Sequence, residues 1–225
     1  GNIGSAYASD WFTLYPYDLL GSSYYANVGP EGTVTTAIVL QNPTDSAIVV
    51  NWETTAGAQT PINLSAHGST WIAMPTAGSG AHFYTTGARF QAISLTNSGG
   101  QANDWGYTLI PENQLTQQAK VGWGAGRDPT STVLPLENGS PVWLVAIGTG
   151  TMTICADYDG DGLGALTDSN GLQYDQLISL TNLQREKIFD TDGDQTGMLL
   201  YLCNGSEADL NNMIAVTWGQ DPATA

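Results

Sequence analysis

The sequence predicts an all-β protein with two tandem antiparallel β-sandwich domains of the immunoglobulin-like or jelly-roll-like kind. Amphipathic helical patterns are scarce, and short apolar runs are separated by clusters of Gly, Asn, Asp, Ser, Thr and Pro, which is typical of many short strands joined by turns. The motifs of the first half also recur, in order, in the second half. With 225 residues, the chain is long enough for one large or two small β domains. One continuous sandwich is the alternative.

The predicted strands form two sets, because a turn-rich segment without apolar runs separates them. The only helical prediction is one short turn in "PENQLTQQAK". The first set is Val34–Asn42, Ala47–Glu53, Pro61–Leu64, Thr70–Met74, Arg89–Thr96 and Trp105–Ile110. The second set is Val142–Ile147, Thr151–Ala156, Gln176–Leu180, Glu186–Phe189, Met198–Cys203 and Met213–Trp218.

The two sets look like copies of one unit. "TTAIVLQNPTDSAIVVNWE" compares with "SPVWLVAIGTGTMTICADYD", and "TPINLSAHGSTWIAM" compares with "DQLISLTNLQREKIF". We also compare "GARFQAISLTNSGGQANDWGYTL" with "GMLLYLCNGSEADLNNMIAVTWG". The offset between matching residues grows from 104 for Val50 and Ile154 to 116 for Leu64 and Leu180, so the second copy carries an insertion of 12 residues. That insertion is a loop rich in aspartate.

The chain is therefore expected to divide into four parts. Residues 1–25 form an aromatic N-terminal arm or first strand, and residues 26–128 form the first sandwich. A linker over 129–140 leads to the second sandwich at 141–225, which carries the aspartate-rich loops. An aromatic arm that cannot fold alone is suited to pair with the open sheet edge of a neighbouring copy.

Five segments carry a family resemblance. They are "SDWFTLYP", "VTTAIVLQNPTDSAIVV", "GARFQAISLTNS", "WGYTLIPE" and the late "DTDGDQTG" turn followed by apolar strands. Their order over Ser9 to Asp221 resembles the β-sandwich domain family, found in bacteria and animals, that is named after the N-terminal region of IgGFc-binding protein. The resemblance implies an extracellular or cell-surface protein with an adhesive or scaffold role and no known catalysis. It supplies no binding residues.

The charge balance excludes several kinds of partner. Asp and Glu outnumber Lys and Arg by 21 to 5, and the net charge is −16. Nucleic acids and anionic membranes are bound by clustered basic residues, whereas the five here are scattered. There is also no run of 18 apolar residues, so no membrane span is expected. The basic residues are Arg89, Lys120, Arg127, Arg185 and Lys187.

The stretch "DYDGDG" has the opening of a calcium loop. Three carboxylates stand at alternate positions and Gly162 then permits a sharp turn. Ca²⁺ prefers oxygen ligands, and alternate Asp side chains converge on one point where the backbone curls around an ion. A strand precedes the loop, so we expect calcium geometry without the EF-hand fold. The predicted ligands are Asp157, Asp159, Asp161, the backbone carbonyl of Leu163, and Asp168 at the twelfth position.

A second acidic turn follows at Asp190, Asp192 and Asp194, with Gln195 in place of the glycine. Counting strand directions places both acidic loops at the same end of the second sandwich, where they share one Ca²⁺ or hold two. Without a cation their carboxylates repel one another. The alternative is that these Asp-Gly runs are solvated β-turns without a metal.

Cys155 and Cys203 are the only cysteines and are a possible disulfide that spans the two sheets of the second sandwich. Strand counting conflicts with this bridge. Cys155 lies near the end of its strand that carries the acidic loops, whereas Cys203 is six residues away from Gly197 at that end. Six residues span about 20 Å in an extended strand. A longer loop after Asp190 or a tilted sheet removes the conflict, and two buried free thiols are the alternative.

Taken together, these patterns predict an extracellular, non-enzymatic structural or adhesive protein. It would be a subunit or module of a surface fibre, layer or adhesin, stabilised by Ca²⁺, that associates with itself or binds a cell-surface ligand. A calcium-dependent glycan- or protein-binding module and an unrecognised hydrolase are the alternatives. No G-x-S-x-G motif or histidine pair with metal spacing occurs, although the members of a Ser/His/Asp triad need not be close in sequence. The only histidines are His67 and His82.

Overall fold

A computed structural model describes residues 15–30, 35–75, 78–97, 105–124, 141–190 and 192–219. The chain divides into two compact units, which we call unit 1 (Gly1–Leu115) and unit 2 (Thr116–Thr224). Both are built from antiparallel strands, and the described residues contain only short 3-10 turns as helical structure. None of these turns is a helix of the length and apolarity that crossing a membrane requires. The all-β prediction is therefore confirmed.

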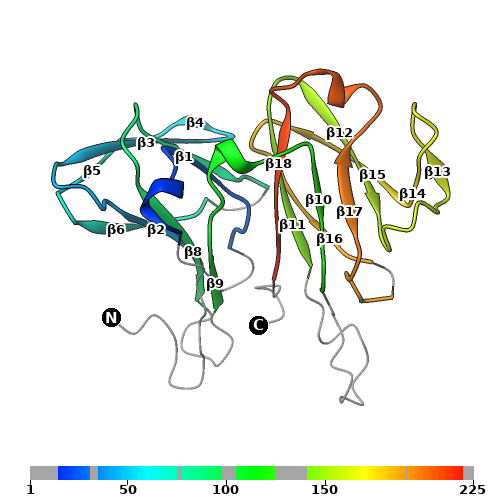
Figure 1. Ribbon diagram of the computed structural model, residues 1–225, viewed down its shortest axis with the longest axis horizontal. Helices are drawn as coiled ribbons and strands as arrows, with labels where there is room; N and C mark the ends of the chain where they lie inside the picture. The colour runs from blue at the N-terminus through cyan, green and yellow to red at the C-terminus, as the bar shows by residue number, and fades with distance from the viewer. Residues whose placement is uncertain are drawn as a thin grey trace, which may run out of the picture. The chain divides into compact units, whose positions relative to one another are not determined.

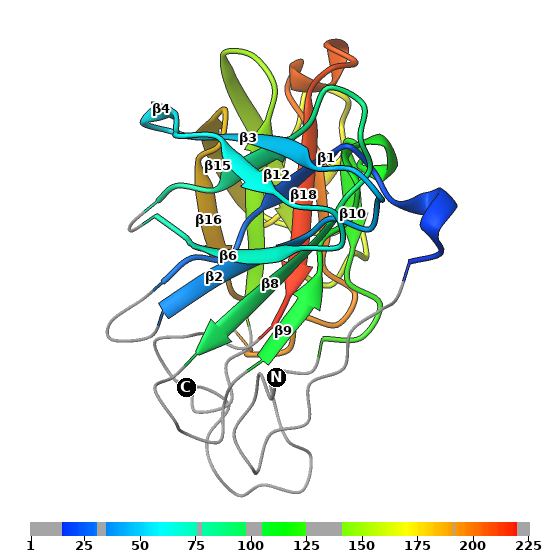
Figure 2. The same cartoon turned by 90° about the vertical axis from the view of Figure 1, so that its left-hand side faces the viewer.

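Unit 1 consists of two facing sheets. One has the strand order β1-β7-β3-β4, with β5 also paired to β3, and the other has the order β6-β2-β8-β9. Figure 2 shows β1 and β3 in one layer above β2, β6, β8 and β9 in the other. The elements are η1 (Tyr17–Leu19), β1 (Ser23–Ala26), β2 (Thr35–Gln41), β3 (Ile48–Thr54), β4 (Gly57–Ala58), β5 (Ile62–Leu64), β6 (Ser69–Ala73), β7 (Ala81–Tyr84), β8 (Gln91–Asn97), β9 (Trp105–Thr108) and η2 (Glu112–Gln114).

The core of unit 1 lies between these sheets. Alternate residues of each strand point inward, because successive side chains of a strand face opposite sides of the sheet. Val50 and Phe83 come from one sheet, and Ile38 and Ala92 come from the other. All four have an exposed fraction of 0%. The alternation of apolar and polar residues along the strands therefore decides which face is buried.

Unit 2 also consists of two sheets, with the orders β10-β17-β12-β15 and β16-β11-β18. A small hairpin, β13-β14, is added to them (Figure 1). Its core includes Leu144 of one sheet with Ile154 and Leu200 of the other. The elements are β10 (Gln118–Lys120), β11 (Val142–Ile147), β12 (Thr151–Asp157), β13 (Leu166–Thr167), β14 (Gln173–Tyr174), β15 (Gln176–Thr181), β16 (Arg185–Ile188), β17 (Leu199–Leu202), η4 (Ser206–Ala208) and β18 (Met213–Trp218).

The pairing around the central strands is the same in the two units, which supports the internal repeat. β3 lies between β5 and β7 as β12 lies between β15 and β17, and β2 lies between β6 and β8 as β11 lies between β16 and β18. The matched residues also hold matching register positions. Leu64 lies opposite Ile48, two residues before Val50, and Leu180 lies opposite Met152, two residues before Ile154.

The third sequence comparison is corrected by this pairing. It matched the β8–β9 region with β17–β18, whereas the structure makes β7–β8 the counterpart of β17–β18. β7 was missed because "AHFY" (Ala81–Tyr84) is short and follows glycine and serine, which indicate a turn. Every strand predicted from the sequence is nevertheless present, as is the short turn η2. The missed strands are β4, β7, β10, β13 and β14, while β1 lies at the end of the segment expected to be an arm or first strand.

The division between the units differs from the expected one. β10 pairs with β17 through Gln118–Tyr201, Ala119–Leu200 and Lys120–Leu199, so this strand belongs to the second sandwich although it precedes the expected boundary. β1 holds the same place beside β7 in unit 1. Residue 128, the linker over 129–140 and most of the expected aromatic arm lie outside the described residues.

Candidate functional site

The two aspartate loops of unit 2 meet at one end of its sheet. β12 and β17 are antiparallel neighbours, and Asp157 at the end of β12 lies opposite Leu199 at the start of β17. The loop after β12 and the loop before β17 therefore lie at the same end of these two strands, as strand counting predicted. The two loops approach so closely that only glycine fits at two positions. A Cβ on Gly160 would lie 2.2 Å from the Gly197 carbonyl oxygen, and a Cβ on Gly197 would lie 2.5 Å from the Asp159 carbonyl oxygen.

Asp157 organises the first loop from inside. Its side chain is 2% exposed. Its Oδ1 accepts a hydrogen bond of 2.9 Å from the Gly160 amide, and its Oδ2 accepts one of 2.9 Å from the Gly162 amide. Both glycines have positive φ, 62° and 75°, which L side chains rarely adopt. The alternate spacing of "DYDGDG" thus closes a tight turn on the first carboxylate.

The next two aspartates of this loop are exposed at its surface. Asp161 Oδ1 accepts a 2.8 Å bond from the Leu163 amide, while Asp159 lies among other acids. The pKa of Asp159 is raised above its ordinary value by desolvation, and then by the charges of Asp161, Asp192, Asp175 and Asp157, in that order. Asp192 belongs to the second loop, so carboxylates of both loops act on Asp159. This end of unit 2 is a region of negative potential.

The second loop is a chain of side-chain-to-backbone turns. Asp190 Oδ1 accepts from the Asp192 amide, Asp192 Oδ1 accepts from the Asp194 amide, and Asp194 Oδ1 accepts from the Thr196 amide, over 3.2, 2.7 and 2.9 Å. Asp190 is 8% exposed, and its amide donates to Gln195 Oε1 over 2.7 Å. Gln195 stands where a calcium loop has glycine, and here its side chain closes the loop.

Asp168, a further predicted ligand, organises a different turn. Asp168 is 6% exposed, and its Oδ1 accepts from the amides of Asn170 and Leu172, both over 2.8 Å, so it closes the turn between β13 and β14. It is not among the groups that raise the pKa of Asp159. Leu163 stays in the first loop, where its amide donates to Asp161, and it is 64% exposed. Sequence spacing suggested an EF-hand-like twelfth position, but Asp168 is drawn away by the hairpin that follows the loop.

Two residues of the site were missed in the sequence. Asp175 Oδ2 accepts a 2.9 Å bond from the Tyr158 amide, and its charge acts on Asp159. Lys120 of β10 donates to the Gly160 carbonyl oxygen over 3.3 Å, which brings one ammonium group to the acidic loops. Neither residue is part of an alternate-acid pattern, so only the strand pairing could place them.

As it stands, the described part of the chain contains no group of three or more His, Cys, Asp or Glu side chains arranged to hold a metal ion. Backbone amides use one oxygen of Asp161, Asp192 and Asp194 and both oxygens of Asp157. Asp159, Asp161 and Asp192 are exposed, so their side chains are free to rotate toward a cation. Calcium binding at these loops therefore stays a prediction.

Asp157→Asn is expected to lower the free energy of unfolding of unit 2 by about 2 kcal/mol, because one charge-assisted hydrogen bond is lost and an amide donor is buried without a partner. Chemical denaturation in the presence of a chelator measures this loss. Asp159→Asn is the matched control, since Asp159 is exposed and its charge is repelled. Equal stability of the two variants would contradict the role given to Asp157.

Cys155 and Cys203 form a disulfide, with their Cα atoms 5.9 Å apart. The expectation that it spans the two sheets is wrong, because β12 and β17 are neighbours in one sheet. Cys155 lies opposite Tyr201, and the Cys203 amide donates to the Thr153 carbonyl oxygen over 3.0 Å. The conflict in strand counting disappears because β17 begins only at Leu199, opposite Asp157, and runs antiparallel to β12, so Cys203 lies within two residues of the position opposite Cys155.

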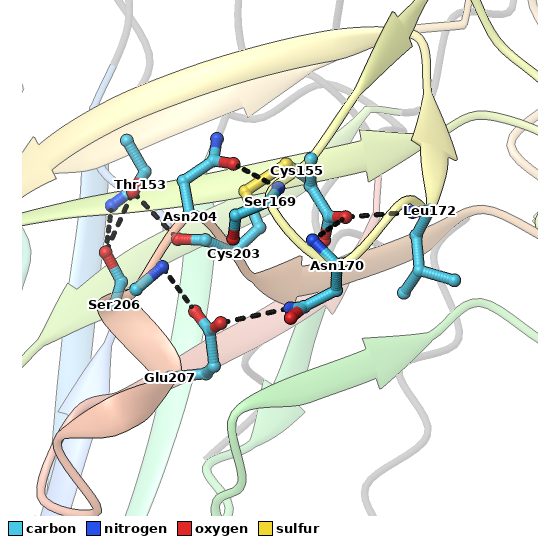
Figure 3. Close-up of a disulfide and its surroundings, with 11 residues drawn as sticks. Thr153, Cys155, Ser169, Asn170, Leu172, Cys203, Asn204, Ser206 and Glu207 are labelled. Atoms are coloured by element: carbon cyan, nitrogen blue, oxygen red, sulfur yellow. Dashed lines mark hydrogen bonds between the residues drawn. A yellow bond between two sulfur atoms is a disulfide. The ribbon is translucent and has the colours of Figure 1, made fainter.

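The disulfide lies on the sheet face opposite the core, where the 12-residue insertion covers it. Cys155, Cys203 and Tyr174 of β14 form a small buried cluster, and Tyr201 packs against it. Figure 3 shows two hydrogen bonds that tie the insertion to the turn after β17. The Ser169 amide donates to Asn204 Oδ1 over 2.9 Å, and Asn170 Nδ2 donates to Glu207 Oε1 over 3.1 Å.

Comparison of the chain with protein-family models, with curated proteins and with solved structures gives no significant match.

Proposed function

We propose that this chain is an extracellular structural or adhesive module in which Ca²⁺ stabilises the aspartate end of unit 2. The observation that carries the proposal is the contact between the two aspartate loops. The pKa of Asp159 is raised there by desolvation and then by the charges of four further carboxylates from both sides of the contact, those of Asp161, Asp192, Asp175 and Asp157. The alternative is that both loops are solvated β-turns without a metal. Such turns form separately, and they give no reason for acids of the two loops to lie close together.

A hard divalent cation is the ligand that suits this end of unit 2. Ca²⁺ takes six to eight oxygen ligands, from carboxylates, backbone carbonyls and water. Carboxylates are concentrated there, and the carbonyl groups of Asp159 and Gly197 lie at the contact between the loops. Lys120 supplies only one positive charge. A bound ion would neutralise the repulsion and join the two loops, which is a structural rather than a catalytic role.

The disulfide supports an extracellular location. Disulfides form and persist in oxidising compartments and are rare in the cytosol. A bridge buried under Tyr174 is part of the fold, because the insertion covers it only when unit 2 is folded. Localisation outside the cell or at its surface, and the family resemblance described above, stay parts of the proposal.

Calcium is expected to raise the unfolding transition of unit 2. A ligand that binds only the folded state stabilises it by about 2.7 kcal/mol at a hundredfold excess over the dissociation constant. Thermal unfolding of the full chain with Ca²⁺ and with chelator measures this difference. Asp159→Asn is expected to abolish the shift, and Glu186→Gln on β16, an exposed acid outside the loops, is expected to keep it.

Elemental analysis of the purified chain completes this experiment. If the wild-type transition does not shift and the protein is metal-free, the calcium part of the proposal is wrong. If the Asp159→Asn variant shifts as much as the wild type, calcium binds elsewhere. A calcium-dependent binding module would show the same shift, so this measurement tests the ion that both roles require.

A further inference from the structure

The outer face of the first sheet of unit 1 brings three reactive side chains into a row. β7 lies between β1 and β3, and His82 on β7 lies opposite Tyr25 on β1 and Glu53 on β3. Ser23 is two residues before Tyr25, so it shares the same face. Phe83 and Trp52 point to the core instead. The three strands therefore present Ser23, His82 and Glu53 together on the side away from the core.

The hydrogen bonds in this row form a relay. Ser23 Oγ lies 2.7 Å from His82 Nε2, and His82 Nδ1 lies 2.9 Å from Glu53 Oε1. An ionised carboxylate only accepts hydrogen bonds, so Glu53 fixes the tautomer that carries the proton on Nδ1. The neutral imidazole then offers Nε2 as the acceptor for the Ser23 hydroxyl. This is the order of nucleophile, base and orienting acid found in serine hydrolases.

Two aromatic rings hold the imidazole in place. Tyr25 stacks on His82 with ring centres 4.2 Å apart and planes within 5°, and the ring of Tyr84 lies 4.7 Å away. The Tyr25 hydroxyl donates to Glu112 Oε1 of η2 over 3.3 Å, which fixes the Tyr25 ring in turn. The side chain of His82 is 14% exposed and that of Glu53 36%. The base is therefore shielded and oriented before any substrate arrives.

Ser23 also lines a pocket of about 300 Å³ that lies within unit 1. This volume is at the lower limit of small-molecule sites. The pocket wall includes Asn113 and Gln114, whose N–H groups are donors of the kind that stabilise a developing oxyanion. It also includes the acids Asp18 and Glu112, and Arg89, whose guanidinium is paired with Asp18. The wall also includes Leu19 and Leu20, which offer apolar surface to a short acyl chain.

We propose that Ser23, His82 and Glu53 form a serine-nucleophile site for small acyl esters. Ser23 Oγ attacks the acyl carbon while His82 Nε2 takes its proton, and the alcohol leaves with that proton as the ester C–O bond breaks. Water then attacks the acyl group on Ser23, gives a proton to His82, and the acid leaves as Ser23 regains its hydrogen. Ser23 and His82 are the catalytic residues, and Glu53 is a positioning residue.

This activity goes beyond the structural role proposed for unit 2 and does not depend on it. The second histidine offers a comparison within the same chain. His67 Nε2 lies 2.9 Å from Asp45 Oδ1, but this pair is 64% and 98% exposed. A histidine–carboxylate contact alone is thus an ordinary surface feature here. His82 differs in being shielded, in contact with two aromatic rings and hydrogen-bonded to a serine that lines a pocket.

A fluorophosphonate probe tests the proposal, because it forms a covalent bond with an activated serine and releases fluoride. Peptide mass spectrometry of the labelled full chain is expected to place the probe on Ser23. Ser23→Ala is expected to lose that label, and His82→Gln to slow labelling by at least about 100-fold. Glu53→Gln is expected to slow it and to displace its pH profile. His67→Gln, the matched control, is expected to label at the wild-type rate.

The wild-type pH profile keeps the test decisive even if a variant does not fold. Labelling is expected to rise with pH, because only the neutral imidazole of His82 can accept the Ser23 proton. Hydrolysis of 4-nitrophenyl acetate is expected to follow the same profile and to stop in Ser23→Ala. Absence of the label on wild-type Ser23, labelling independent of pH, or full labelling of a folded His82→Gln variant would each overturn the proposal.

Discussion

Replacing Cys155 and Cys203 together by alanine is expected to lower the free energy of unfolding of unit 2 by about 4 kcal/mol. The bond closes a loop over a sequence separation of 48 residues, and a cross-link of this length removes much conformational entropy from the unfolded chain. Loss of the sulfur atoms also empties part of the cluster with Tyr174. Denaturant unfolding of the transition assigned to unit 2 measures the change.

Single variants provide the control for this prediction. Cys203→Ala alone is expected to cost nearly as much as the double change, because either substitution removes the bond. Treatment of the wild type with reductant is expected to give a similar loss. The transition of unit 1, which holds neither cysteine, is expected to stay in place. A loss below about 1 kcal/mol in all three forms would show that the disulfide contributes little to the fold.

Phe83→Ala is expected to lower the free energy of unfolding of unit 1 by about 3 to 5 kcal/mol, the cost of truncating a large core side chain. Phe83 is 0% exposed, and its ring lies parallel to that of Trp52 with centres 5.5 Å apart. Alanine at this position removes both the buried area and the ring contact, and it leaves a cavity between the two sheets. Denaturant unfolding measures the change.

Val49→Ala is the matched control for the core prediction. Val49 lies on β3 of the same sheet but is 48% exposed, so its truncation is expected to change stability by about 0.5 kcal/mol or less. If Phe83→Ala cost no more than Val49→Ala, the two-sheet core of unit 1 would be wrong. The pair also tests the alternation of buried and exposed positions from which the fold class was predicted.

The strands could be predicted because their signals are local. In Thr35–Gln41 and Met213–Trp218, apolar β-branched residues lie between turn residues, and these patterns depend only on near neighbours. Strands with a weak local signal were missed. Gln118–Lys120 is polar and becomes a strand only because β17 offers it a free edge. The same holds for the division between the units, which the pairing of this strand decides.

The aspartate loops show how far residue spacing alone can predict a candidate site. Alternate spacing correctly indicated tight turns at Asp157 and Asp190, because such turns form between residues two to five apart. It also suggested Asp168 as a ligand, but the hairpin β13-β14 takes that side chain elsewhere. Asp175 and Lys120 reach the loops through the fold of the chain and not through their spacing.

The sequence by itself determined the all-β class, most strands, the internal repeat and the acidic turns, since hydrophobic alternation and turn chemistry act over short distances along the chain. The tertiary structure decided which strands are neighbours. It placed the disulfide within one sheet, joined the two aspartate loops, and aligned Ser23, His82 and Glu53 across separations of 59 and 29 residues. Contacts of that kind depend on sheet order and register, which are set by packing of the whole core and leave no mark in the spacing of the residues they unite.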